Sequence, residues 1–358
     1  MSSSTVEPAS GGFPYGRLAF ALALGFGGAI VFLMLSLPLP WMLGSLTACL
    51  LGSLLKFPIA APGKIRPPML MLVGVLLGSG FSPNLLSGLW LWAPSLACII
   101  LFVLIGGSLC FLYFRRVAGF DVPTAYFSGM PGGMIEMVAL GEAQGGDPRK
   151  IALVQSSRIM LTVLLIPAVL ALATGVVVAR GQSAGVSIVQ VPLMSELWLL
   201  VTGLVGVVLG RRLRLPSPYL MGPMLASAAV HLSGLTDFRP AVEIVAFAQV
   251  ALGSVLGCSF AGTRPRDILS VLGISLGSTL LLVSLGTAFA FALATATGIP
   301  LLALLLAYSP GGLTETSLIA LALNVEIAFV ATHHVLRVFF ITVSAAAFFR
   351  AFDRKNGS

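Results

Sequence analysis

The chain has 358 residues, of which 58% are hydrophobic and only 9% are charged, and its mean hydropathy is +1.04. Soluble domains carry about 25% charged residues, so this chain lacks the polar surface that a water-soluble protein of its size needs. It is also too apolar to be disordered. Its continuous apolar runs of about twenty residues differ from the alternating pattern of a β-barrel. We therefore predict an all-α polytopic membrane protein with the lipid bilayer as its main partner.

The net charge of +8 does not indicate nucleic-acid binding. The basic residues occur in short clusters between apolar runs, as topology signals do, and no patch combines them with exposed aromatic residues. The four cysteines lie inside apolar runs, where a packing role is expected. We predict no nucleic-acid partner.

Taken in order, the chain begins with a polar segment, residues 1–16, that we expect to be disordered. A first membrane repeat (17–180), a linker (181–194), a second membrane repeat (195–350) and a cytoplasmic tail (351–358) follow. The apolar elements lie at 17–37, 41–57, 68–82, 89–114, 121–144 and 150–179 in the first repeat, and at 195–210, 218–234, 241–260, 267–297, 299–324 and 326–349 in the second.

The two repeats share landmarks at a nearly constant offset. The segment 130–136, MPGGMIE, corresponds to 309–315, SPGGLTE, at an offset of 179. Arg158 corresponds to Arg337 at the same offset, and a P-x-P-[WY]-x-x-G pattern at 38–44 recurs at 216–222, an offset of 178. Several matches in the same order indicate an internal duplication of nearly the whole chain.

The fifth element of each repeat carries Pro-Gly-Gly at its centre, which breaks a helix into two short arms. Basic residues decide whether these elements cross the membrane. If both are re-entrant hairpins, sixteen basic residues lie on the cytoplasmic side and only Arg180 and Arg239 lie outside; if they cross, the division is eleven to seven. We therefore predict two re-entrant hairpins.

Five crossings and one hairpin make an odd count, so the second repeat is inverted relative to the first. The prediction is ten spanning helices, two Pro-Gly-Gly hairpins that enter from opposite faces, and two cytoplasmic termini. Inverted repeats whose broken helices meet near the midplane are typical of secondary transporters.

The hairpin tips are the first candidate site. Free amides near Pro131-Gly132-Gly133 and Pro310-Gly311-Gly312 offer N–H donors and the positive end of a helix dipole to an anion. The alternative is a glycine-rich packing contact between helices.

Four ionisable residues lie at membrane depth, where a charge is costly and is by default a functional candidate. Glu136 and Glu315 follow the glycine pairs, and Arg158 and Arg337 lie 22 residues further on. In one interpretation the arginines bind a carboxylate-like substrate and the glutamates bind or relay a proton or cation. In the other, Glu136 pairs with Arg158 and Glu315 with Arg337, and the pairs fix each hairpin in place.

The second hairpin is the more polar. Thr314, Thr316 and Ser317, together with Ser309, add hydroxyl groups, which either contact a substrate or bond to their own helix. His333 and His334 are candidates for a proton relay. Adjacent helical residues diverge by about 100° and cannot easily hold one ion, so we predict no metal. The sequence has no P-loop, Rossmann fingerprint or GxSxG elbow, so we also predict no cofactor and no catalytic residue.

The paired Pro-Gly-Gly-x-x-Glu hairpins, the P-x-P-[WY]-x-x-G segments and the duplication resemble the AbrB family of bacterial membrane proteins. The family's labels, a membrane regulator of gene expression or an ammonia monooxygenase, are what the resemblance implies about activity. We predict an inner-membrane secondary carrier for a small organic anion, coupled to protons or a cation and possessing no enzymatic activity. The alternative is a non-transporting regulator, and homodimerisation follows only by analogy with carriers.

Overall fold

A computed structural model describes residues 15–37, 39–61, 64–83, 90–175, 187–236 and 240–356, and no strand occurs among them. Two predicted segments lie partly outside the described residues: 1–14 of the segment 1–16 that we expect to be disordered, and 181–186 of the linker 181–194. The last helix continues through Asn356, so the described part of the predicted tail 351–358 is helical.

The helices follow the predicted elements closely. The first repeat forms α1 (Tyr15–Met34), η1 (Pro40–Gly44), α2 (Ser45–Leu54), α3 (Arg66–Gly78), α4 (Ala93–Arg116), α5 (Val122–Gly129), α6 (Met134–Ala143) and α7 (Pro148–Thr174). The second forms α8 (Leu193–Arg212), α9 (Pro218–Leu232), α10 (Val242–Cys258), α11 (Pro265–Thr297), α12 (Leu301–Ala307), α13 (Leu313–Ala322) and α14 (Ile327–Asn356). The short η1 runs directly into α2.

Within the described residues, six helices are long and apolar enough to cross a membrane: α1, α4, α7, α8, α11 and α14. This is consistent with a multi-pass membrane protein. The predicted count of ten crossings includes four further helices, η1–α2, α3, α9 and α10, which have 10 to 17 residues each. At a rise of 1.5 Å per residue, these are shorter than the roughly 30 Å hydrocarbon core.

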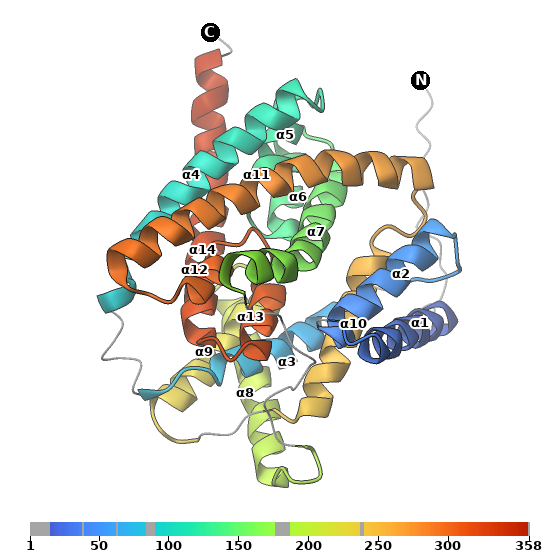
Figure 1. Ribbon diagram of the computed structural model, residues 1–358, viewed down its shortest axis with the longest axis vertical. Helices are drawn as coiled ribbons and strands as arrows, with labels where there is room; N and C mark the ends of the chain where they lie inside the picture. Colours follow the sequence, from blue (N-terminus) through green and yellow to red (C-terminus); the bar gives the residue numbers. More distant parts are fainter. Residues whose placement is uncertain are drawn as a thin grey trace.

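The helices form two groups, which are visible in Figure 1. In the scaffold bundle, α3 packs on α9, α8 on α9, α10 on η1 and α2, and α1 on η1 and α2. In the hairpin bundle, α4 to α7 pack with α11 to α14. The two bundles meet where α3 contacts α13 and α14. The first three elements of each repeat thus build one bundle and the last three build the other.

Close glycine contacts hold the scaffold bundle together, and they recur between the repeats. A Cβ at Gly44 would lie 2.5 Å from the carbonyl oxygen of Gly28, and one at Gly222 would lie 2.1 Å from that of Gly206. Only glycine permits backbones to approach this closely, and such contacts are common between membrane helices. The two contacts share an offset of 178 residues, so the duplication is retained in the packing.

The first broken element turns back on itself. Asp121 caps α5 by accepting a hydrogen bond from the Thr124 amide at 2.9 Å, and the Asp147 amide, beyond the end of α6, donates to Thr124 Oγ1 at 2.9 Å. Asp147 in turn caps α7, because its Oδ1 accepts from the amides of Arg149 and Lys150. The two ends of the element therefore lie side by side, as the predicted hairpin requires.

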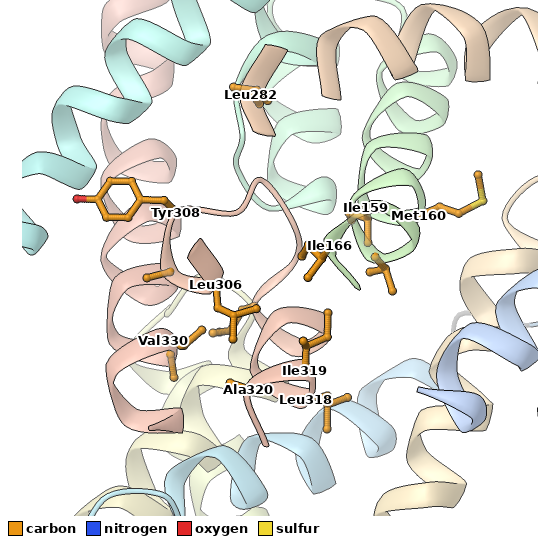
Figure 2. Close-up of a cluster of buried hydrophobic side chains, with 14 of the residues drawn as sticks. Ile159, Met160, Ile166, Leu282, Leu306, Tyr308, Leu318, Ile319, Ala320 and Val330 are labelled. Carbon is orange, nitrogen blue, oxygen red and sulfur yellow. The ribbon is translucent and has the colours of Figure 1, made fainter. Parts of the chain in front are cut away.

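The second broken element is also a hairpin. The residues before α12 and those after α13, including Pro300 and Val325, line a common cavity of about 480 Å³. Figure 2 shows side chains from both arms of this hairpin, among them Leu306, Leu318 and Ile319, in an apolar cluster that also includes Ile159 and Ile166 of α7. Burial of these apolar side chains stabilises a segment whose helix is interrupted by Pro-Gly-Gly.

Candidate functional site

Each hairpin is broken at its glycine pair, as predicted. Helices α6 and α13 begin after Gly133 and Gly312, which have extended backbones and no side chain to cap the helix. The first amides of a helix have no partner within the helix and carry partial positive charge. Two such helix starts therefore lie within the hairpin bundle.

The buried arginines bind the other side of each break. Arg158 Nη1 donates to the carbonyl of Met130 at 3.1 Å, and Arg337 donates to the carbonyls of Ser309 and Gly311 at 2.6 Å each. These carbonyls follow the ends of α5 and α12, where the helix dipole is negative. Each guanidinium thus holds the end of the first arm of its own hairpin.

The interpretation in which Glu136 pairs with Arg158 and Glu315 with Arg337 is wrong. Throughout the described part of the chain the only ion pair joins Lys150 to Asp147. The arginines instead use their donors on backbone carbonyls, which sequence patterns do not display.

The glutamate carboxylates fold back over the glycines that start their helices. A Cβ added to Gly133 would lie 2.1 Å from Oε2 of Glu136, and one added to Gly312 would lie 2.0 Å from Oε2 of Glu315. A glutamate three residues into a helix commonly reaches back in this way and places its negative charge at the helix start. A side chain at either glycine would displace the carboxylate from the helix start.

One cavity of about 70 Å³ brings these groups together. It lies between the two bundles and has room for a few water molecules. From the hairpin bundle it is lined by Gly132, Gly133, Met134, Ile135, Glu136, Arg158, Ile159, Gly311, Gly312, Leu313, Thr314, Glu315, Arg337 and Val338. From the scaffold bundle it is lined by Arg66, Leu70, Ser217, Leu220 and Met221.

The cavity is rich in unsatisfied polar groups. Arg158 and Arg337 are almost fully buried and their like charges repel each other. Among the described residues, the Nε atom of each has no hydrogen-bond partner. Oε2 of Glu315 is likewise buried without a partner. Buried polar atoms without partners are costly, so they mark places where a ligand, an ion or water is expected.

Comparison with known proteins agrees with this arrangement. A family model described as "Transition state regulatory protein AbrB" matches residues 41–353, a range that contains both hairpins. The chain belongs to the AbrB family. It is 27% identical over 326 residues to the Escherichia coli K12 protein named "Putative regulator AbrB", covering 90% of this chain and 92% of that protein. It is 24% identical over 357 residues to "Uncharacterized protein YhjN" of Bacillus subtilis 168, covering 94% and 93%.

Several predicted site residues of this AbrB-family chain do not line the cavity. Ser309 contributes its carbonyl to Arg337, while Thr316 Oγ1 donates to the carbonyl of Gly312 at 2.8 Å. The prolines Pro131 and Pro310 are also buried but lie outside the cavity lining. For Thr316, the alternative of a bond to its own helix is the one that the structure supports.

The two histidines differ in their hydrogen bonds. His334 Nδ1 accepts from Arg337 at 2.9 Å, so its proton must be on Nε2, which lies 3.0 Å from the carbonyl of Leu306. An arginine can only donate and a carbonyl can only accept, which fixes the neutral imidazole in one tautomer. Gln155 makes the equivalent contacts with Arg158 and Phe127 in the first repeat, so His334 orients the arginine.

His333 points about 100° away from His334 around the helix, and neither histidine lines the cavity. Its Nδ1 donates to the carbonyl of Phe329 at 2.8 Å, and its Nε2 lies 2.9 Å from Ser95 Oγ. Because the serine hydroxyl also lies 2.8 Å from the carbonyl of Trp92, it can donate to either group. His333 can therefore exchange a proton without losing a hydrogen bond, whereas His334 cannot while Arg337 donates to it.

Sequence reasoning missed the contribution of the scaffold bundle. Oε1 of Glu136 accepts a hydrogen bond from the backbone amide of Ser217 at 3.0 Å, and Arg66 lines the same cavity. Arg66 is one of the sixteen basic residues that the hairpin prediction places on the cytoplasmic side, and its position in the sequence does not indicate a site. Ser217 lies within the repeated P-x-P segment 216–222, so the sequence did contain a signal for it, but not for the contact that its backbone makes.

Proposed function

We propose that this AbrB-family protein is a secondary carrier of a small organic anion, coupled to protons or to a cation. One observation carries the proposal: both hairpin tips, both buried arginines and both glutamates line a single cavity between two helical bundles. Helix starts and guanidinium groups bind carboxylates well, and at membrane depth both are costly without such a partner.

The proposed membrane arrangement has ten spanning helices in two inverted repeats, both termini in the cytoplasm and a location in the inner membrane. The charge distribution supports it, because re-entrant hairpins leave sixteen basic residues on one side and two on the other. The contacts support the duplication: Arg158 binds Met130 and Arg337 binds Ser309, both pairs at the same offset. In carriers with inverted repeats the substrate lies where the broken helices meet.

Transport requires that the cavity open to each side in turn. The two-bundle architecture supports such a change, because the hairpin bundle can move relative to the scaffold bundle as a body. The glutamates are the proposed carriers of the coupling charge. Their carboxylates already occupy the two helix starts, so a substrate carboxylate competes with them, and protonation of a glutamate would release its helix start.

Flux into proteoliposomes tests the proposal. Purified protein is reconstituted, and uptake from a panel of labelled mono- and dicarboxylates is measured under an imposed proton or sodium gradient. We expect uptake of at least one anion by the wild-type protein, and its loss in Arg158→Gln and Arg337→Gln. Arg116→Gln, at an exposed position on α4, is the matched control and keeps wild-type flux. No uptake across the panel under either gradient would refute the carrier function.

A second candidate, a membrane protein that regulates gene expression without transport, is favoured by the regulatory names of the family model and of the Escherichia coli relative. A transcript profile of a deletion strain complemented with Glu315→Gln separates the two candidates. A transport-dead Glu315→Gln that restores the wild-type profile supports the regulator. A profile that follows flux supports the carrier, with any regulation arising from the transported anion.

A further inference from the structure

The scaffold bundle contains two equivalent turns, one in each repeat. Leu39 and Ser217 each precede a proline and start a helix, Pro40–Leu54 and Pro218–Leu232. Both have a left-handed backbone, with φ of 48° in each case. This conformation is unfavourable for residues other than glycine, and it persists where the surrounding structure demands it. The same strained turn has therefore been kept in both repeats.

Only one of the two turns binds a hairpin. The amide of Ser217 donates to Oε1 of Glu136 at 3.0 Å, which links the first hairpin to the scaffold bundle. By the repeat offsets, the equivalent pair is the amide of Leu39 and the carboxylate of Glu315. That bond is not formed: in the described part of the chain the Leu39 amide has no acceptor, and Oε2 of Glu315 is buried without a donor.

The cavity shows the same asymmetry. Its scaffold wall includes Leu220 and Met221 of α9, beside Ser217. Their equivalents in the first repeat, Met42 and Leu43, do not line the cavity. On the hairpin side, Ile135 is 59% exposed whereas its equivalent Thr314 is 6% exposed. The cavity is thus lined by scaffold residues around the Ser217 turn and not by those around the equivalent Leu39 turn.

We propose that the backbone amide of Leu39 is a second docking site for a hairpin carboxylate, that of Glu315, which forms when Glu136 leaves Ser217. This inference rests on the proposed function, because it makes the two bonds markers of the two states of an alternating carrier. The bond uses a backbone amide, so the replacement of serine by leucine between the repeats leaves the site intact. Glu315 gains the donor that it lacks in the present state.

Cross-linking of cysteine pairs tests the inference without knowledge of the substrate. In full-length protein whose four native cysteines are replaced, Glu136→Cys with Ser217→Cys reports the observed state. Leu39→Cys with Glu315→Cys reports the second state, and Leu39→Cys with Glu136→Cys is the mismatched control. Oxidation traps each visit to the second state, so this state need not be the major one. We expect the first two pairs to form disulfides in membranes and the control pair to form none.

Formation of the first pair alone would overturn the inference. Spin labels at the exposed positions Leu101, on α4 of the hairpin bundle, and Leu213, at the end of α8 in the scaffold bundle, provide a second measurement that leaves both docking sites intact. We expect two distance populations between these labels, and a single population would overturn the inference even if a cysteine variant failed to fold. Cross-linking with no anion flux would refute the carrier function only, whereas flux without the second pair would refute only the role of Leu39.

Discussion

The two arginines make unequal numbers of contacts with their hairpins, and the difference predicts unequal costs of removal. Arg337 donates to two hairpin carbonyls, those of Ser309 and Gly311, whereas Arg158 donates to one, that of Met130. Each also has one side-chain partner, His334 or Gln155. Arg337→Met and Arg158→Met therefore remove similar side chains and similar buried charges, but Arg337→Met breaks one more charged hydrogen bond.

Hydrogen bonds that involve a charged group contribute about 1.5–3 kcal/mol each. We therefore expect Arg337→Met to lower the free energy of unfolding by about 1.5–3 kcal/mol more than Arg158→Met does. The costs of desolvating each guanidinium and of its repulsion by the other largely cancel in this comparison. Titration with a denaturing detergent in mixed micelles, followed by tryptophan fluorescence, measures the difference. Equal losses, or a larger loss in Arg158→Met, would refute the account of how the hairpins are held.

Two further predictions concern the glycines and the cap of the first hairpin. Gly312→Ala places a methyl group where Oε2 of Glu315 lies, so the carboxylate must move away from the helix start. We expect the free energy of unfolding to fall by about 0.3–1 kcal/mol, and we expect this loss to disappear in a Glu315→Ala background. Gly273→Ala, which meets no neighbouring atom, is the control, and equal losses in both backgrounds would contradict the carboxylate position. Burial alone would raise the pKa of Asp121, but hydrogen bonds from Thr124 outweigh it and hold the pKa below its usual value. The stabilisation by this cap is therefore complete above the unfolded-state pKa of Asp121 and is lost as the pH falls through the lower folded-state pKa. We expect Asp121→Ala to lower the free energy of unfolding by about 1 kcal/mol at neutral pH and by little in acid. A loss that does not depend on pH, measured by thermal unfolding, would argue against this cap.

Much of the architecture could be predicted from sequence because it depends on local properties. Apolar length predicted where helices run, and Pro-Gly-Gly predicted both breaks, since these residues disfavour helix wherever they occur. The constant offset between Glu136 and Glu315, and between Arg158 and Arg337, singled out these four side chains as candidates. All four line one cavity.

The partners of those side chains could not be predicted in the same way. Arg337 bonds to carbonyls and Glu136 to the amide of Ser217, 81 residues away, and backbone groups look alike in every sequence. Opposite charges alone are compatible with a glutamate–arginine pair. In the structure the arginines donate instead to backbone carbonyls at the break in each hairpin. His334 was a candidate proton relay by residue type, but its neighbours require a fixed neutral tautomer.

The central claim is that the two hairpins enter the membrane from opposite sides and meet at one cavity. Single cysteines at Phe120 and Gly146, which flank the first hairpin, and at Gly298 and Val325, which flank the second, test it in a background without native cysteines. A membrane-impermeant maleimide applied to intact cells should label positions 298 and 325 only, and positions 120 and 146 only after the membrane is opened. Labelling of either hairpin on both sides, or of both hairpins on one side, would contradict the claim.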